Sequence, residues 1–403
     1  MKKIMLFAAL TIAAYTTKAT DLVVQENGPV GTYASISAAI TAAVDGDRII
    51  INNRPGGLYW AEDLTINKSL QFLSYADTIR FKYQGTVTIT PAVGREITII
   101  GMENNIGSII ASVNSPAGTR TKVNIFNCLL TAGSINFDYN YFDINLVSNI
   151  LNGGNVTIRY GKLIGNMITT AGSTNGVIIN TDAIASNDSI QIIGNKIYST
   201  SYSISLNTSA QYFFVSNNLL KNTTSTVLIF VGAIKTASGL NSILNNSFYG
   251  FSDIYLSGIS GYRLEILNNV AYTTNSGYYF LYFNGGTVGT INASYNYMHS
   301  NLSFSSSTGY TNNGTNVFST NVTYSNSTTL INSGSSPAIN GAHPGKFYYD
   351  LDLTRGDAGC YGSSWTLNNF FPISGSSRVY MITSPRAAIS GSIINIKADG
   401  FDR

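Results

Sequence analysis

The stretch Arg263-Leu-Glu-Ile-Leu-Asn-Asn-Val-Ala271 contains the pattern that decides the fold, because near-copies of it return along the middle of the chain. In each copy apolar and polar residues alternate, an asparagine follows, and apolar residues resume. The copies lie at residues 144–151, 161–168, 190–197, 212–219, 241–248 and 291–298. Residues 123–130 fit one step earlier, with Cys128 in the place of the asparagine.

The alternation within each copy is the period of a β-strand, and the Gly, Ser and Asn residues that follow favour turns. Units of this length cannot bury an apolar face alone and must stack on their neighbours. The repeat therefore predicts a solenoid built of β-strand coils.

One asparagine position is shared by all the copies. The predicted register is Asn149, Asn166, Asn195, Asn217, Asn246, Asn269 and Asn296. Asparagine tolerates left-handed backbone at a corner, and stacked amides can hydrogen-bond from coil to coil. Two residues further on, the same register predicts an interior column of Leu151, Ile168, Ile197, Leu219, Phe248, Ala271 and Met298.

The composition of the chain limits its partners. Only 11% of the 403 residues are charged and the net charge is +3, so we expect no binding to nucleic acid. No stretch after the N-terminus has the roughly 18 uncharged apolar residues of a transmembrane helix. Because a repeat protein grows as a single body, we expect one soluble monomer.

The first residues have the pattern of an export signal. Lys2 and Lys3 precede a short apolar run, and Thr17-Lys-Ala19 provides the small residues of a cleavage site. We therefore expect residues 1–19 to be a bacterial-type signal peptide. The mature protein would be secreted, extracellular or held in the cell envelope.

The two cysteines, Cys128 and Cys360, would be candidates for a disulfide in an oxidising compartment. Many coils separate them, and coils stack about 4.8 Å apart, so the two residues exceed the roughly 7 Å limit for bridging. We predict no intramolecular disulfide and a buried thiol at Cys128.

Residues 33–44 form the one convincing helical pattern, with Ile36, Ala39, Ile40 and Ala43 on one face and Ser35 as a possible N-cap. A solenoid leaves its first coil with open edges and an exposed apolar end. The helix is therefore predicted to cover that end.

The order of helix, Gly-Asp, β run, Pro-Gly turn and paired β runs over residues 33–100 resembles the opening of right-handed parallel β-helix proteins, the pectin-lyase-like superfamily. The segment Ser335-Ser-Pro-Ala-Ile-Asn-Gly341, with residues 350–362 after it, resembles the closing coil of secreted bacterial members. The resemblance implies a right-handed parallel β-helix over residues 20–362. It implies no single activity, since the superfamily includes lyases, hydrolases, epimerases and adhesins.

The C-terminal part has weaker patterns. Residues 303–333 are predicted to form coils with a degenerate repeat pattern and long loops, with strand fragments at 315–318 and 321–324. Residues 365–372 would pack on the last coil, and strands at 378–382 and 392–397 would close the C-terminal end. Residues 363–403 are thus predicted to be a β cap, or alternatively the start of a further β domain.

A catalytic site requires acids and bases on adjacent coils. The two histidines lie apart and no Asp-Asp pair occurs, which argues against a glycoside hydrolase. The register places Asp143 six, Arg159 and Asp188 seven, and Lys162 four residues before their asparagines. On stacked coils they could bind Ca²⁺ and abstract a proton, as the resemblance to polysaccharide lyases implies. The alternative is a column of ion pairs on a solvated strand edge.

Aromatic residues are the other candidates. The chain has 26 tyrosines, and Tyr139, Tyr141, Tyr278, Tyr282, Tyr295 and Tyr297 fall in or near the coils. Tyrosine faces suit sugar rings, although stacking between coils would also explain them. The favoured hypothesis is a non-catalytic module that binds extended polysaccharide or another surface without a cofactor. A calcium-assisted lyase acting on uronic-acid glycans is the alternative, and only it would require Ca²⁺.

Overall fold

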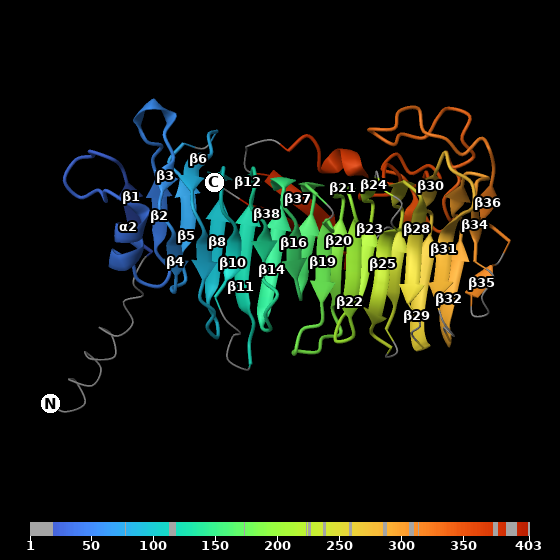
Figure 1. The fold of residues 1–403 in the computed structure, drawn as a ribbon, viewed down its shortest axis with the longest axis horizontal. Helices are drawn as coiled ribbons and strands as arrows, with labels where there is room; N and C mark the ends of the chain where they lie inside the picture. Colours follow the sequence, from blue (N-terminus) through green and yellow to red (C-terminus); the bar gives the residue numbers. More distant parts are fainter. Residues whose placement is uncertain are drawn as a thin grey trace.

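The computed structural model describes residues 19–401, except 77, 113–117, 173, 223, 225–226, 237–238, 258–259, 285–287, 306–309, 313, 374–377 and 384–392. The predicted signal peptide therefore lies, apart from Ala19, outside the described residues. The chain winds into a stack of coils along one long axis, from blue to orange in Figure 1.

Each complete coil contributes one strand to each of three parallel sheets, which confirms the predicted parallel β-helix. The first sheet contains β1 (Asp21–Val24), β2 (Arg48–Ile51), β5 (Gln71–Ser74), β8 (Glu96–Ile100), β11 (Thr121–Phe126), β14 (Phe142–Val147), β17 (Gly161–Ile164), β20 (Ser189–Ile193), β23 (Tyr212–Ser216), β26 (Asn241–Leu244), β29 (Ser260–Leu267), β32 (Val288–Ser294) and β35 (Tyr310–Asn312). The second sheet contains β3 (Trp60–Ala61), β6 (Phe81–Gln84), β9 (Met102–Asn104), β12 (Leu129–Leu130), β15 (Ile150–Gly153), β18 (Met167–Thr170), β21 (Lys196–Ser199), β24 (Leu219–Asn222), β27 (Ser247–Tyr249), β30 (Val270–Tyr272), β33 (Tyr297–Met298) and β36 (Val317–Phe318). The third sheet contains β4 (Leu64–Ile66), β7 (Val87–Ile89), β10 (Ile109–Ala111), β13 (Ile135–Asn136), β16 (Val156–Ile158), β19 (Val177–Asn180), β22 (Ile204–Thr208), β25 (Val227–Ile234), β28 (Ser252–Ser257), β31 (Tyr278–Asn284) and β34 (Leu302–Phe304).

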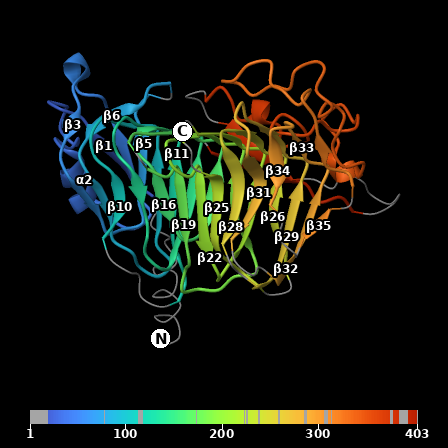
Figure 2. The same ribbon diagram turned by 45° about the vertical axis from the view of Figure 1, so that its right-hand side comes forward.

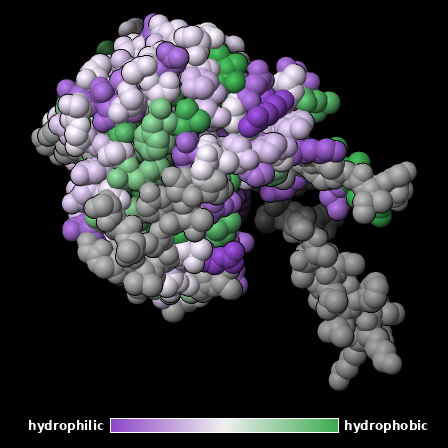
Figure 3. Space-filling model, turned by 90° about the vertical axis from the view of Figure 1, so that its right-hand side faces the viewer, coloured by the Kyte–Doolittle hydropathy of each residue, from purple (hydrophilic) through white to green (hydrophobic). Residues whose placement is uncertain are grey.

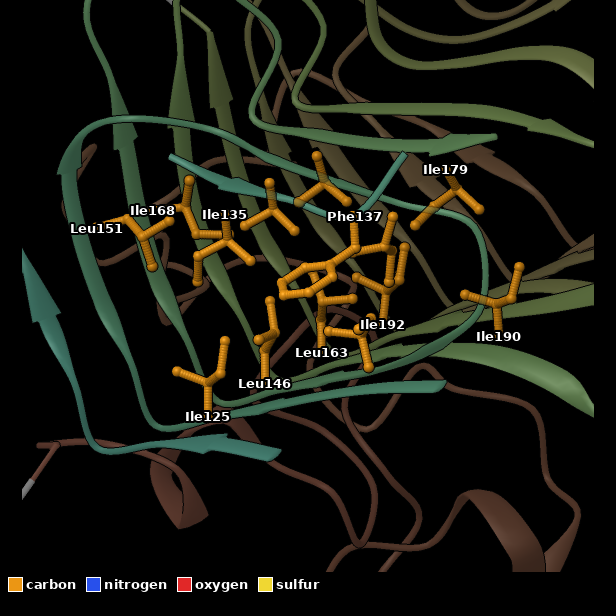
Figure 4. Close-up of a cluster of buried hydrophobic side chains, with 14 of the residues drawn as sticks. Ile125, Ile135, Phe137, Leu146, Leu151, Leu163, Ile168, Ile179, Ile190 and Ile192 are labelled. Carbon is orange, nitrogen blue, oxygen red and sulfur yellow. The ribbon is translucent and has the colours of Figure 1, made fainter. Parts of the chain in front are cut away.

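The interior is a single apolar core that follows the axis. Residues of the same register stack directly on one another, as Ile125, Leu146, Leu163 and Ile192 do in the first sheet. Figure 4 shows their side chains pointing inward together with those of the other two sheets. Alternate residues along each strand face this core because successive side chains of a strand point to opposite faces.

The asparagine ladder is confirmed, with one residue corrected. Its rungs are Asn149, Asn166, Asn195, Asn218, Asn246, Asn269, Asn296 and Asn316, which lie between the first and second sheets. Asn217 was therefore assigned wrongly by one position, and Leu220 takes the place of Leu219 in the interior column. In the pair Asn217-Asn218 the sequence offers two asparagines, and only the second amide points along the axis.

The left-handed backbone lies one residue before each rung from Asn149 to Asn296, not at the rung as predicted. Ser148, Gly165, Gly194, Asn217, Asn245, Asn268 and Tyr295 have φ between 53° and 66°. These residues turn the chain from the first sheet into the second. The rung asparagine can then direct its amide along the axis of the helix.

The interior rungs share one pattern of hydrogen bonds, which Asn195 illustrates. Oδ1 of Asn195 accepts the backbone N–H and the Nδ2 of Asn166, both at 2.9 Å. Its Nδ2 donates to Oδ1 of Asn218 and to the carbonyl of Leu163, also at 2.9 Å. Cys128 begins the ladder as predicted, because its N–H donates to Oδ1 of Asn149 and its Sγ lies 3.7 Å from the carbonyl of Ile99.

Helix α2 (Ile36–Ala42) covers the first end of the core, as predicted. The side chain of Ser35 accepts a hydrogen bond from the backbone N–H of Ala38, and Ile36, Ala39 and Ile40 are buried. Within the described residues the chain also forms three short 3₁₀ helices: η1 (Pro55–Gly57), η2 (Lys346–Tyr348) and η3 (Leu367–Asn369).

The chain after β36 does not add further coils. Instead it runs back along the outside of the helix, as the orange and red segments of Figures 1 and 2 show. Val322, Ala338 and Ala358 pack on Val270 and Tyr297, on the outer face of the second sheet. The expected strand at 321–324 and the expected closing coil at 335–362 are therefore wrong, because these residues cover a flank of the coils.

The small antiparallel sheet of β37 (Arg378–Thr383) and β38 (Lys397–Phe401) is present, but it does not close the C-terminal end. Phe401 stacks on Phe126 with ring centroids 5.3 Å apart, far from the last coil. Together with Phe370 it covers an outward row of the first sheet: Leu73, Ile100, Phe126, Val147, Ile164 and Ile193. Residues 365–372 likewise lie along this flank instead of on the last coil.

Both cysteines are free and buried, which confirms the prediction of no disulfide and a buried thiol at Cys128. Cys360 lies on the outer side of the second sheet, where Leu219, Leu330 and Leu367 surround it.

Asp253, on β28, is a buried carboxyl group whose Oδ2 has no hydrogen-bond partner among the described residues. Burial raises the pKa of Asp253 well above its ordinary value of 3.8. Burial therefore favours the neutral carboxyl in the folded protein, and the stability of the fold falls as the pH rises above about 4.

Asparagine has no ionisable group, so we expect Asp253→Asn to remove the loss of stability that occurs as the pH rises. The free energy of unfolding should increase by about 1–3 kcal/mol at pH 7. The gain should shrink at pH 4, where the carboxyl is largely protonated in both states. Thermal denaturation at pH 4 and pH 7 measures both values. Asp188→Asn, on an exposed loop, serves as the control, and a gain independent of pH would contradict the assignment.

Candidate functional site

The outer face of the first sheet carries the polar side chains that the coils bring together. Glu96, Lys122 and Asp143 stand side by side on β8, β11 and β14. The next outward row begins with Asn124 and Asn145, whose side chains share a hydrogen bond of 2.9 Å. It continues with Lys162, Gln191 and Phe214 on β17, β20 and β23.

A cavity of about 620 Å³ lies over this face. Its floor comes from β14 to β23, one side comes from the loop before β20, and the other comes from the returning C-terminal segment. The lining residues are Asp143, Tyr160, Lys162, Asn187, Asp188, Ser189, Gln191, Ile193, Phe214, Trp365 and Met381. We call it the polar cavity.

Three of the four predicted catalytic residues, Asp143, Lys162 and Asp188, line the polar cavity. Arg159 does not. It forms an ion pair of 2.9 Å with Asp138 and donates to Asn140 Oδ1 at 2.6 Å. Arg159 directly follows β16 and therefore lies at the edge of the third sheet. The prediction counted residues back from Asn166 and so placed Arg159 wrongly on the first sheet.

The charges of the polar cavity are only partly compensated. Burial raises the pKa of Asp143, while the charges of Arg120, Lys162 and Lys122 act to lower it. The Arg120 guanidinium lies 3.9 Å from the ring centroid of Tyr160 and donates to the carbonyl of Ile184. Burial also raises the pKa of Tyr160, with a further contribution from the negative charge of Asp143.

Two groups of the polar cavity have no partner among the described residues. The ammonium of Lys162 makes no hydrogen bond or ion pair there, and Oε1 of Gln191 is buried without a donor. The Lys162 ammonium is therefore available to a ligand with hydroxyl groups. Within the described part of the chain, no group of three or more His, Cys, Asp and Glu side chains could hold a metal ion.

A second cavity, of about 560 Å³, adjoins the polar cavity and shares Phe214, Trp365 and Met381 with it. We call it the apolar cavity. The remaining lining residues are Ser216, Leu244, Asn245, Phe347, Tyr348, Leu351, Ser363, Ser364, Asn369, Phe370, Val379, Tyr380 and Ile382.

The predicted tyrosines lie elsewhere, since none of the six lines either cavity. Tyr282 belongs to a column on the outer face of the third sheet with Tyr202, Phe230 and Tyr255, whose ring centroids are 5.0–5.5 Å apart. Because the rings stack on one another along the helix axis, most of their faces are already covered.

The other tyrosines also have local partners. Tyr278 packs edge-on against Phe251, and Tyr139 packs against the core. Tyr297 is buried and donates to the carbonyl of Gly341 at 2.7 Å. The two remaining ones occupy turns: Tyr141 and Tyr295 both have left-handed backbone, and Tyr295 packs edge-on against His343.

The aromatic residues of the cavities were missed because most of them come from the returning segment. One signal for that segment was present in the sequence. Several strands of the first sheet end with two successive apolar residues, as in Leu146-Val147, Leu163-Ile164 and Ile192-Ile193. Such a pair cannot place both side chains in the core, so the outer face must be covered as well.

The fold and these cavities define a parallel β-solenoid whose returning C-terminal segment forms one side of a groove. No protein-family model, curated protein or solved structure matched the chain in the comparisons that were made. None of the helices in the described part of the chain has the length and apolar character needed to cross a membrane.

Proposed function

We propose that the protein binds an extended polysaccharide, without cleaving it, in the groove formed by the polar and apolar cavities. The observation that carries this proposal is the continuity of the two cavities, which meet at Phe214, Trp365 and Met381. The floor passes over five neighbouring strands, from β14 to β26. At about 4.8 Å per strand this is ~19 Å, long enough for several sugar units in a row.

The chemistry of the groove suits carbohydrate. Sugar rings have apolar faces that pack on aromatic side chains, and hydroxyls that need polar partners. Phe214 and Trp365 lie edge to face at 5.5 Å where the two cavities join. Lys162, Gln191 and Asp143 line the polar cavity beside them and are polar or charged.

The proposed place of action is outside the cytoplasm, either secreted or in the cell envelope. The basic and apolar pattern of the first 19 residues supports this part of the proposal.

A calcium-assisted polysaccharide lyase is the second candidate, since Asp143, Lys162 and Asp188 line one cavity. The place of Arg159, paired with Asp138, counts against it. Absorbance near 235 nm separates the two candidates when the protein is incubated with uronic-acid polysaccharides and Ca²⁺. A rise that Lys162→Ala abolishes would establish the lyase, and retention in a glycan-affinity gel without such a rise supports binding alone.

We expect Trp365→Ala and Lys162→Ala each to weaken retention in glycan-affinity electrophoresis by about tenfold or more, because each removes a central contact of the groove. Tyr282→Ala, in the aromatic column of the third sheet, is the matched control and should bind like the wild type. Binding that depends on Tyr282 but not on Trp365 would move the site to the third sheet and refute the proposal.

A further inference from the structure

The apolar cavity differs in character from the polar cavity that it adjoins. It is lined by aromatic and aliphatic side chains together with Ser and Asn, and no lining side chain is charged. Burial raises the pKa of Tyr348 and of Tyr380 to about 12, so both hydroxyls stay neutral at ordinary pH. The cavity therefore offers no counter-charge to an ionic group.

Large apolar side chains around this cavity remain exposed to solvent. Phe347, Leu351, Val379 and Ile382 are 53%, 59%, 57% and 58% exposed and all line it. An exposed apolar cluster beside a cavity typically marks a binding site. Figure 3, which faces the end of the helix at the last coils, shows a further hydrophobic patch within a largely polar surface.

We propose that the polysaccharide bound in the groove carries an uncharged, apolar substituent, an aryl or longer acyl group, which occupies the apolar cavity. This inference rests on the proposed function. A sugar chain over the polar cavity would bring a substituent directly to the shared residues Phe214, Trp365 and Met381.

The size of the cavity limits the substituent. Its volume of about 560 Å³ lies within the range of sites for whole small molecules, roughly 300–1,000 Å³. A methyl or acetyl group would leave most of that space unfilled. A carboxylate or ammonium group would lose its hydration without gaining an ion pair.

The test compares naphthyl and methyl glycosides of the same sugars, such as xylose, galactose and galacturonic acid, by isothermal titration calorimetry. We expect the naphthyl glycoside to bind at least about tenfold more tightly. Leu351→Glu places a charge at the cavity and should abolish that advantage. Leu353→Glu is the matched control, because Leu353 is 72% exposed two residues away and does not line the cavity.

Equal affinity of the two glycosides, or an advantage that Leu351→Glu leaves intact, would overturn the inference. If unsubstituted polysaccharide is retained in the affinity gel while the naphthyl group adds nothing, the inference fails and the proposed function stands. If no glycan is retained while free 1-naphthol binds as tightly as its glycosides, the proposed function fails and the inference falls with it.

Discussion

Replacing Asn195 by alanine is expected to lower the free energy of unfolding by about 3–5 kcal/mol, because three buried groups lose their partners at once. The N–H and the Nδ2 of Asn166 would lose their acceptor, and the carbonyl of Leu163 would lose its donor. Asn195 is fully buried, so water cannot replace these bonds without entering the core. Urea denaturation followed by far-UV circular dichroism measures the change.

Two further variants separate the hydrogen bonds from the volume of the side chain. Asn195→Asp keeps the shape but removes the donor, and should cost nearly as much as alanine. Cys128→Asn, in contrast, adds a donor opposite the carbonyl of Ile99 and an amide beside Asn149, so it should be neutral or stabilising. A loss below about 1 kcal/mol for Asn195→Ala would show that the ladder contributes little.

Replacing Gly194 by asparagine is expected to detach the returning segment from the coils. Gly194 has φ +66°, and an added Cβ would lie 2.2 Å from the ring of Phe370. The equivalent position holds Asn217, Asn245 and Asn268 in other coils, so asparagine fits the backbone. The three atoms nearest to the added Cβ all belong to Phe370. We therefore expect the new side chain to displace Phe370, at a cost of about 3–5 kcal/mol, like that of losing a buried Phe.

Limited proteolysis within residues 363–401 and the fluorescence of Trp365 report the detachment. Trp60, the second tryptophan, is buried at the other end of the helix and gives a constant background. Gly172→Asn is the control, since Gly172 also has φ +66° but no atom lies within 4 Å of an added Cβ. In combination with Phe370→Ala, Gly194→Asn should cost much less than it does alone, and simple additivity would contradict the proposed collision.

The coils could be predicted from the sequence because their determinants are local. Strand alternation, the repeated asparagine and the apolar residue two places later all lie within about eight residues of one another. Where two asparagines are adjacent, as at Asn217-Asn218, the sequence alone did not decide which one faces the axis. The error is physically small, since both are buried and both hydrogen-bonded.

The groove could be predicted only in part. Asp143, Lys162 and Asp188 were found because stacked strands place equal registers together. Trp365 and Phe370 were not assigned to the groove, because their partners lie on strands more than 140 residues earlier. No short-range pattern determines which flank a returning segment covers. Only the paired apolar residues at the strand ends indicated that some segment must cover it.

The path of the returning segment has a consequence for assembly. Each coil needs only the coil before it, so the helix can form progressively while the polypeptide is still being made. The groove cannot, because Trp365 and Tyr380 are synthesised after every coil that they cover. A chain that stopped before Trp365 would fold into coils with one wall of the groove missing and the apolar row of the first sheet uncovered. The protein would therefore become able to bind its ligand only at the end of its synthesis. Until then the exposed apolar row of the first sheet would make the unfinished chain prone to aggregate.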